Sequence, residues 1–300
     1  MTAVELLPDT ATSVVADPRG SHGPVRRGGA LRAAVRRPGL VLAVLVLLLV
    51  LGWAFFPEWF TSRDPFTGVP RDKLTAPGAE YWFGTDHLGR DLYTRVVYGA
   101  ALSLKATAIA VAVGFVAGTL IGLVSGFVGG RFDGVVMRLV DVLLSIPGLL
   151  LSLAVVTALG FGTVNVAIAV GVASVASFAR VMRADVFRAR TEVFVEAATV
   201  SGVSRPEILL RHVLPHALGS VLVLAALEFG GAILAVSALS FLGFGAPPPQ
   251  PEWGALVSEG RNYLASAWWL TTLPGFVVAA SVLAANRISR ALDRDGGDFR

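Results

Sequence analysis

Five long stretches of this sequence contain no Asp, Glu, Lys or Arg, and they limit the possible folds more than any other feature. They cover residues 39–57, 106–130, 142–179, 229–251 and 262–286. A helix that crosses the hydrocarbon layer of a membrane needs about 20 mostly apolar residues, so each stretch has a suitable length. A water-soluble helical protein would instead place polar residues along one face of each helix. The sequence therefore predicts an all-α integral membrane protein.

Six membrane-spanning helices follow when these stretches are divided at turn residues. The charge-free stretch 142–179 is too long for one span, and Gly160-Phe161-Gly162-Thr163 predicts a tight turn between two helices. The predicted spans are 39–57, 102–128, 135–159, 164–181, 217–243 and 270–289. Because six is an even number, both ends of the chain are expected on the same side of the membrane.

The Lys and Arg residues predict which side that is. When the arginines at the ends of spans are counted with the adjoining loops, eighteen lie on the side of the two termini and six on the opposite side, with Lys105 inside a span. Membrane proteins concentrate these residues in cytoplasmic loops, so both termini are expected in the cytoplasm. Because the arginines cluster at the ends of spans, the basic balance of 25 Lys and Arg against 21 Asp and Glu does not indicate a nucleic-acid partner.

The segments between the spans complete the predicted organisation. Residues 1–38 are polar and rich in Pro and Gly, which predicts a disordered cytoplasmic tail. The run 39–57 is too long for a signal-peptide core and precedes no small-residue cleavage site, so it predicts an uncleaved N-terminal span. A periplasmic segment 58–101 follows, then a five-span core 102–289, and a cytoplasmic tail 290–300.

The cytoplasmic loop 182–216 contains the most informative local pattern. Residues 191–201 are typical of a short amphipathic helix, and Gly202 is typical of a residue that ends one. Ser204 then predicts the N-cap of a second helix, which leads towards the fifth span. The small residues at 197 and 198 would allow a partner to approach the helix backbone closely. A helix-turn-helix at this place has no function towards lipid, so a protein partner is expected.

The same loop resembles that of a known family. Glu196-Ala197-Ala198, then Gly202, then Leu214-Pro215, is similar to the EAA loop of ABC-importer permeases. His212 stands where most of these permeases have an aliphatic residue, and this matches the dipeptide/oligopeptide/nickel branch. Three further segments resemble that branch, namely Gly84–Asp91 with Tyr98–Ala100, Leu239–Gly245 and Pro248–Gly254. Ala101, Val236 and His216 depart from its pattern.

The resemblance implies a function and a set of partners. It implies a C-type permease subunit with an extra N-terminal span, in a bacterial cytoplasmic membrane. Its partners would be a homologous permease chain, two ABC ATPases and an extracytoplasmic solute-binding protein, and its cargo peptides, nickel or another small solute. The helix 191–202 would be the coupling helix that docks into an ATPase cleft. Glu196 would make polar contacts there, while Ala197, Ala198 and Gly202 would permit close approach.

Several kinds of chemistry have no basis in this sequence. A P-loop needs Gly-Lys before Ser or Thr, and neither Lys73 nor Lys105 follows a glycine, so ATP and magnesium are expected on partner chains. Cysteine is absent, which excludes a disulfide framework and a thiolate site. His212 and His216 have the spacing of two metal ligands on one helix, but Pro215 lies between them and no third ligand is evident. We therefore expect no metal site and no enzymatic activity.

Two features inside the spans have open interpretations. Glu228 interrupts the fifth span, so it is expected to face a cavity or another helix rather than lipid. It is interpreted either as part of the translocation pathway or as a hydrogen-bonded acid between helices. The second span carries glycines every fourth residue, a spacing that predicts a tight helix contact, although glycine is also common in such helices. These glycines are Gly114, Gly118, Gly122 and Gly126.

Other transport classes are the alternatives to an ATP-driven importer. A secondary transporter driven by an ion gradient would show inverted repeats and helices broken at matching positions. The two halves of this sequence show no convincing similarity, and such a carrier would not need the cytoplasmic loop. An ion channel or an inert scaffold is the third alternative, and no ring of charged residues or filter pattern supports it.

Overall fold

The computed structural model describes residues 38–296, and most of this part of the chain is helical. A segment in lipid must pair its own backbone polar groups, so apolar stretches of this length form helices. The long ones are α2 (Pro38–Phe55), α3 (Leu92–Val128), α4 (Gly130–Ser145), α5 (Gly148–Leu159), α6 (Thr163–Ala189), α9 (Leu214–Phe241) and α11 (Trp269–Gly296). The short ones are α7 (Val193–Val200), α8 (Arg205–Ile208) and α10 (Trp253–Gly260). Apart from Pro38, which begins α2, the predicted tail 1–38 lies outside the described residues.

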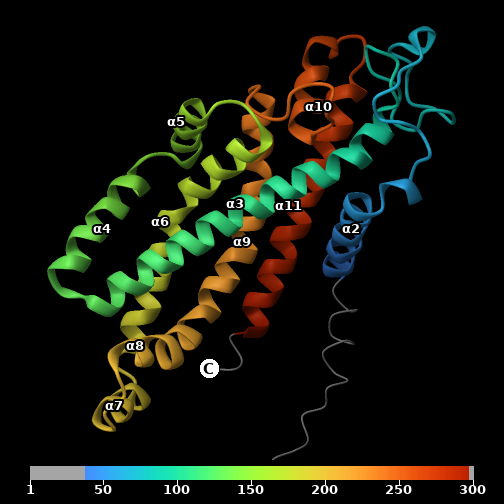
Figure 1. Cartoon of the computed structure of the whole chain (residues 1–300). Coiled ribbons are helices and arrows are strands. Elements are labelled where there is room, and N and C mark those ends of the chain that lie inside the picture. The colour runs from blue at the N-terminus through green and yellow to red at the C-terminus, as the bar shows by residue number, and fades with distance from the viewer. Residues whose placement is uncertain (1–37, 297–300) are drawn as a thin grey trace, which may run out of the picture. The chain divides into compact units, whose positions relative to one another are not determined.

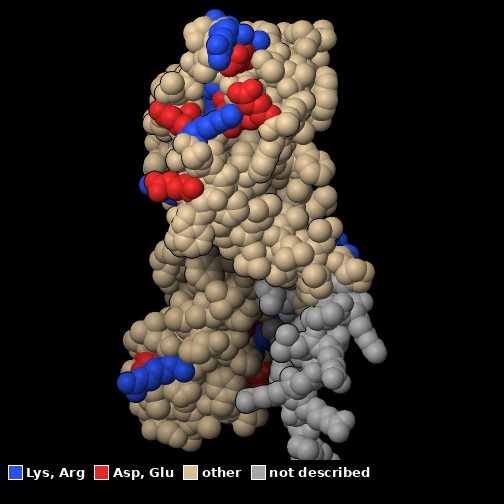
Figure 2. All heavy atoms as spheres, turned by 90° about the vertical axis from the view of Figure 1, so that its right-hand side faces the viewer, with Lys and Arg blue, Asp and Glu red and all other residues tan. Residues whose placement is uncertain are grey.

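The described helices confirm an all-α membrane protein. Five of them are long and apolar enough to cross a membrane, and the pair α4–α5 makes a sixth span if it is counted as one. With α4–α5 counted as one span, the prediction of six spans is confirmed. Charged side chains gather at the ends of the body, and the band between them is mostly uncharged on the face in Figure 2.

The span predicted over 135–159 is not one continuous helix. The helix is broken, and the axes of α4 and α5 differ by 96°. Proline disfavours the helical conformation of the residue before it, and Ile146 is extended with ψ of 129°. The predicted turn at 160–163 is present, with Gly160 at a φ of +89°, and it separates α5 from α6.

The glycine stripe of α3 forms the predicted tight helix contact. All four glycines are buried against α6 along most of its length. A β-carbon added to Gly122 would lie 2.8 Å from the β-carbon of Met182, and one added to Gly114 would lie 3.1 Å from the carbonyl oxygen of Gly171. The absence of side chains therefore allows α3 and α6 to pack backbone against backbone.

The remaining long helices extend this pair into a bundle (Figure 1). The helix α9 packs against α6, α3 and α11, and α2 packs against α11 and α3. The hydroxyl of Ser289 in α11 donates to the carbonyl of Ala226 in α9 at 2.5 Å. The helix α2 is mostly exposed in this chain, as Leu42 and Leu48 at 63% and 59% illustrate, which fits a helix surrounded by lipid.

The connections gather at two opposite ends of the bundle, which we call the α10 end and the α7 end (Figure 1). The segment 56–91 and α10 lie at the α10 end, and α7 and α8 lie at the α7 end.

Several helices are longer than their predicted spans. The helix α6 continues to Ala189, and the helical segment of the fifth span begins at Arg205. The predicted loop was 182–216, and only residues 190–204 lie between these two helices. The predicted tail 290–300 begins within α11, which ends at Gly296.

Candidate functional site

The helix α7 protrudes at one end of the bundle and is attached to it mainly through one face (Figure 1). Val195 is buried with an exposed fraction of 7%, and it joins a cluster that includes Ile208, Val213 and Met182. Ala198, one helical turn later, is half-buried against the same cluster. The close approach predicted for Ala198 is therefore made towards the body of this chain, and Ala197 is the small residue that faces outwards.

The opposite face of α7 is exposed and has no partner among residues 38–296. Val193, Glu196, Ala197 and Val200 are spaced so that they share this face. Val193 and Val200 are 78% and 84% exposed. Within the described part of the chain, the Glu196 carboxylate makes no hydrogen bond or ion pair. We call these four residues the α7 outer face, and it combines a small apolar surface with one free acceptor of hydrogen bonds.

Gly202 ends α7 in the manner that the sequence predicts. Its φ is +80°, a conformation that side chains with a β-carbon rarely adopt. The N–H of Val203 donates to the carbonyl of Ala198 and that of Gly202 to the carbonyl of Thr199, both at 3.1 Å, which is the Schellman pattern. A β-carbon at Gly202 would meet nothing within 4 Å, so the space beside the glycine is open to a partner.

Leu214 and Pro215 lie apart from the α7 outer face, in the helix that leads back into the membrane. The prediction of a second helix at Ser204 is confirmed in position, although the Ser204 hydroxyl caps nothing. The chain does not break before the fifth span, because a π-helical turn at Leu209–Val213 joins α8 to α9. Pro215 has no N–H, so the usual helical bond to the carbonyl of Arg211 cannot form, and the wider turn accommodates this.

Among residues 38–296, neither His212 nor His216 belongs to a group of three or more side chains that could hold a metal ion. The ring of His216 lies 5.7 Å from that of Phe194, which connects the start of α9 with α7. Among the described residues, one group of three side chains has the spacing of metal ligands, with ligand atoms within 4.8 Å of one another. It consists of Asp86, His87 and Glu259 and lies at the α10 end. Both carboxylates already bind arginines there, so this group offers no free charge for a cation.

Glu228 lies in α9 and is half-buried. Its side chain finds no hydrogen-bond or ion-pair partner among the residues that the structure describes. The interpretation as a hydrogen-bonded acid between helices of this chain therefore lacks a partner residue. The interpretation as part of the pathway stays a prediction.

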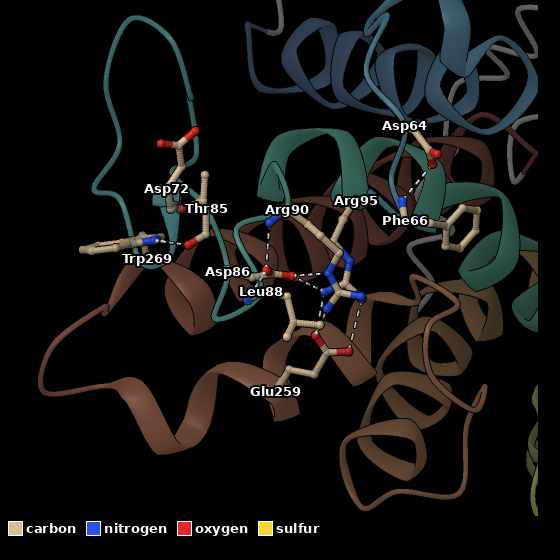
Figure 3. Close-up of polar contacts among 10 residues, drawn as sticks. All are labelled: Asp64, Phe66, Asp72, Thr85, Asp86, Leu88, Arg90, Arg95, Glu259 and Trp269. Carbon is tan, nitrogen blue, oxygen red and sulfur yellow. Dashed lines mark hydrogen bonds and ion pairs between the residues drawn. The ribbon is translucent and has the colours of Figure 1, made fainter. Parts of the chain in front are cut away.

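A buried group of charges at the α10 end was not predicted (Figure 3). Arg95 in α3, with an exposed fraction of 0%, donates to Asp86 at 2.9 Å and to Glu259 of α10 at 2.6 Å. Arg90 donates to Asp86 at 2.6 Å. We call Asp86, Arg90, Arg95 and Glu259 the ion cluster. Asp86 and Arg90 stand in the motif that resembles the peptide/nickel branch, but nothing in the sequence links them to Glu259.

The electrostatics of Asp86 follow from its neighbours. Burial pushes the pKa of its carboxyl upwards, but the N–H groups of Arg90 and Leu88 and the charges of Arg95 and Arg90 outweigh burial and lower the pKa. Asp86 and Asp91 each cap a local segment of backbone. Asp86 accepts from the N–H of Leu88 at 2.8 Å, and Asp91 is the N-cap of α3.

The bundle of long apolar helices defines the class of this protein as a multi-span membrane protein. Comparison with known proteins gives the family. Residues 118–295 match the family described as binding-protein-dependent transport system inner membrane component. The chain belongs to this family, and it is the permease subunit of an ABC importer.

Two relatives and one solved structure illustrate the similarity. The dipeptide transport system permease protein DppC of Alkalihalophilus pseudofirmus is 40% identical over 260 residues, which cover 86% of this chain and 85% of the relative. The glutathione transport system permease protein GsiD of Escherichia coli is 40% identical over 257 residues, covering 85% and 84%. The crystal structure of an amino acid ABC transporter with histidines has a TM-score of 0.53 at 18% identity, covering 68% of this chain and 94% of that one. The last comparison supports the fold alone.

Proposed function

We propose that this chain provides half of the pathway by which small peptides cross a bacterial cytoplasmic membrane, and that α7 couples it to ATP hydrolysis. The observation that carries the proposal is the α7 outer face. Val193 and Val200 are more than three-quarters exposed, and the Glu196 carboxylate beside them is unpartnered within the described part of the chain. An apolar patch with a free acceptor of hydrogen bonds on a protruding helix is a surface suited to a protein partner.

The partners follow from this role. Two ABC ATPases would receive the α7 helices of this chain and of a homologous permease subunit, and an extracytoplasmic binding protein would deliver the solute at the opposite end. ATP and magnesium would bind to the ATPases, because this sequence has no Gly-Lys for a P-loop. This chain would then contribute no catalytic residue. Closure of the ATPases would move α7 and shift the subunits between two global states.

The proposed orientation places the α7 end and both termini in the cytoplasm. It is supported by the Lys and Arg bias, eighteen against six, and by the ATPase partners that α7 requires. Labelling of single cysteines in intact cells tests it, since the chain has no cysteine of its own. A Thr191→Cys protein should react with an impermeant thiol reagent only after the cells are opened. Reaction in intact cells would refute the orientation and the docking role together.

Peptides are the cargo that the relatives support best, because the two named above carry dipeptide and glutathione in their names. Nickel or another small solute is the second possibility. Uptake of radiolabelled dialanine by cells that express the complete importer, against cells lacking this subunit, is the direct measurement.

The Gly202→Asp variant tests coupling. Aspartate tolerates a positive φ better than most residues and would meet no atom within 4 Å, so the protein should insert and assemble. The new side chain would stand in the open space beside α7, so ATP hydrolysis should continue while uptake falls at least tenfold. The Gly202→Asn variant, with nearly the same shape and no charge, is the control for the backbone. Normal uptake by the aspartate variant would count against the docking role.

A secondary transporter driven by an ion gradient is the alternative, and the broken pair α4–α5 is one feature it shares with such carriers. Affinity purification of the tagged chain separates the two. An importer subunit should bring down a P-loop ATPase, and uptake should stop when ATP is depleted. Uptake that follows the proton gradient without any associated ATPase would favour the alternative.

A further inference from the structure

The exposed half of α4 carries two parallel stripes of different chemistry. Exposed polar or small residues recur at alternating steps of three and four, at Arg131, Gly134, Arg138, Asp141 and Ser145. Next to them runs an apolar series with the same steps, Phe132, Val135, Leu139 and Val142, whose exposed fractions lie between 49% and 64%. Steps of three and four keep a series on one face of a helix. The polar stripe and the apolar stripe, as we call them, therefore face different surroundings.

The polar stripe continues onto α6 through an ion pair. Arg180 donates to Asp141 at 2.5 Å, and the two side chains are 57% and 62% exposed. A second pair on the same helices, Arg183 with Asp133, has a buried aspartate that accepts two bonds of 2.6 Å. The buried pair ties α4 to α6. The exposed pair lies further into the two helices and presents both charges outwards.

Lipid is an unsuitable environment for this face. Asp141 is eleven residues from the start of α4 and Arg180 nine from the end of α6, about 14–17 Å from the α7 end of each helix at 1.5 Å per residue. Both residues also lie within the predicted spans 135–159 and 164–181, and charged side chains within a span face the interior of an assembly or a water-filled cavity. Arg138, one turn before Asp141, is exposed and forms no ion pair within residues 38–296.

The break between α4 and α5 supports the same conclusion independently. Residues 145–150 are all exposed, and a β-carbon at Gly148 would meet nothing within 4 Å. Non-helical backbone within a membrane is tolerated only where protein covers it or where it lines a water-filled cavity. The polar stripe leads directly to this corner at Ser145. Figure 1 shows α4 and α5 at the side of the bundle, and they pack against α6.

We propose that the polar stripe of α4, with Arg180, lines the aqueous translocation path, and that Arg138 contacts the carboxylate of the passing solute. This rests on the proposed function. The arginines at 131, 138 and 180 outnumber the single acid at 141, so the surface favours an anionic group. A peptide presents such a group at its C-terminus. The apolar stripe faces lipid or the apolar surface of the second permease subunit.

Thiol labelling provides the first test, because the cysteine-free chain gives no background. Ser145→Cys and Leu139→Cys place thiols on the polar and apolar stripes, both at exposed positions. In membranes with the complete importer, an impermeant maleimide should label Ser145→Cys at least tenfold faster than Leu139→Cys. The rate at Ser145→Cys should also change severalfold between the nucleotide-free and vanadate-trapped states. Equal rates at the two positions, or a rate at Ser145→Cys that does not depend on nucleotide, would overturn the proposal.

Uptake of dialanine at low concentration tests the role of Arg138. Arg138→Gln should lower uptake about tenfold with the amount of co-purified ATPase unchanged, and Arg138→Lys should retain most of it. Arg71→Gln, which removes an 87% exposed charge at the α10 end, is the control and should be neutral. Unchanged uptake by Arg138→Gln would exclude the proposed contact between Arg138 and the carboxylate of the solute. If the wild-type importer takes up no peptide, the proposed cargo is wrong, while the labelling experiment still decides whether the stripe lines the path.

Discussion

The two ends of the bundle are built in opposite ways. At the α10 end, Arg95, Glu252 and Trp253 each have an exposed fraction of 0%, and residues far apart in sequence bind one another. At the α7 end, the protruding helix has one buried residue, Val195, and its outer face is open. The comparison indicates that the α10 end is closed by contacts within this chain. We propose that the α7 end is instead completed by another protein.

Arg95→Met is expected to have the largest effect of the changes that test this comparison. It would leave Asp86 and Glu259 with only Arg90, and removing one partner from a buried ionic group costs about 3–5 kcal/mol of folding free energy. Thermal unfolding of the purified protein in detergent measures the loss. Arg63→Met is the matched control, because Arg63 is 41% exposed and 3.9 Å from Asp91, and such a pair contributes less than about 1 kcal/mol. Equal losses would show that the α10 end is no more rigid than an ordinary surface.

Acid should weaken the α10 end through Asp86. Its pKa in the folded protein lies below the ordinary value of about 3.9, so the charged form is favoured by folding. The resulting stability is complete above the ordinary value and is lost as the pH falls through the lowered folded pKa. The unfolding temperature should therefore drop as the pH falls below about 4, and the drop should be smaller in Asp86→Asn. An unchanged pH profile in that variant would exclude Asp86 as the cause.

Val195→Ala should have a smaller and local effect at the α7 end. Removing two methyl groups from this buried anchor should cost roughly 1–2 kcal/mol, mainly in the attachment of α7. Hydrogen exchange should become faster over residues 193–203 and stay unchanged in α10. Val200→Ala, at a site 84% exposed, should alter neither. Faster exchange throughout the bundle would mean that α7 belongs to the rigid part of the fold.

Glu196→Gln should leave the stability of this chain within about 0.5 kcal/mol, the smallest of the expected effects, because the carboxylate has no partner in the described residues. If Glu196 contacts an ATPase, the variant should retain less ATPase on purification. An unfolding temperature that falls by several degrees, with ATPase retention unchanged, would show that Glu196 stabilises the fold of this chain and does not contact an ATPase.

The local features of the candidate site were predictable, because they depend on residues close together in sequence. Gly202 predicted the end of α7, since only a residue without a β-carbon adopts its backbone conformation easily. The EAA-like motif indicated the position of the loop. The length of the loop was overestimated, because Arg183 and Arg188 were assigned to it. Both lie in α6, where the acids at 133 and 185 pair with them.

The sequence alone determined the class of fold and the contact face of α3. It also determined the number of spans, if the broken pair α4–α5 is counted as one span. Apolar length and the spacing of four glycines are local properties, and the membrane requires helices of any segment so long and apolar. Only the tertiary structure decided which charges meet, as Arg95 and Glu259 do across 164 positions. It also decided that α4 turns away from α5 by 96° and leaves its polar stripe uncovered. The meeting of these charges depends on the relative placement of packed helices, which no local pattern encodes. At the break, Pro147 explains the position, and only the structure gives the angle.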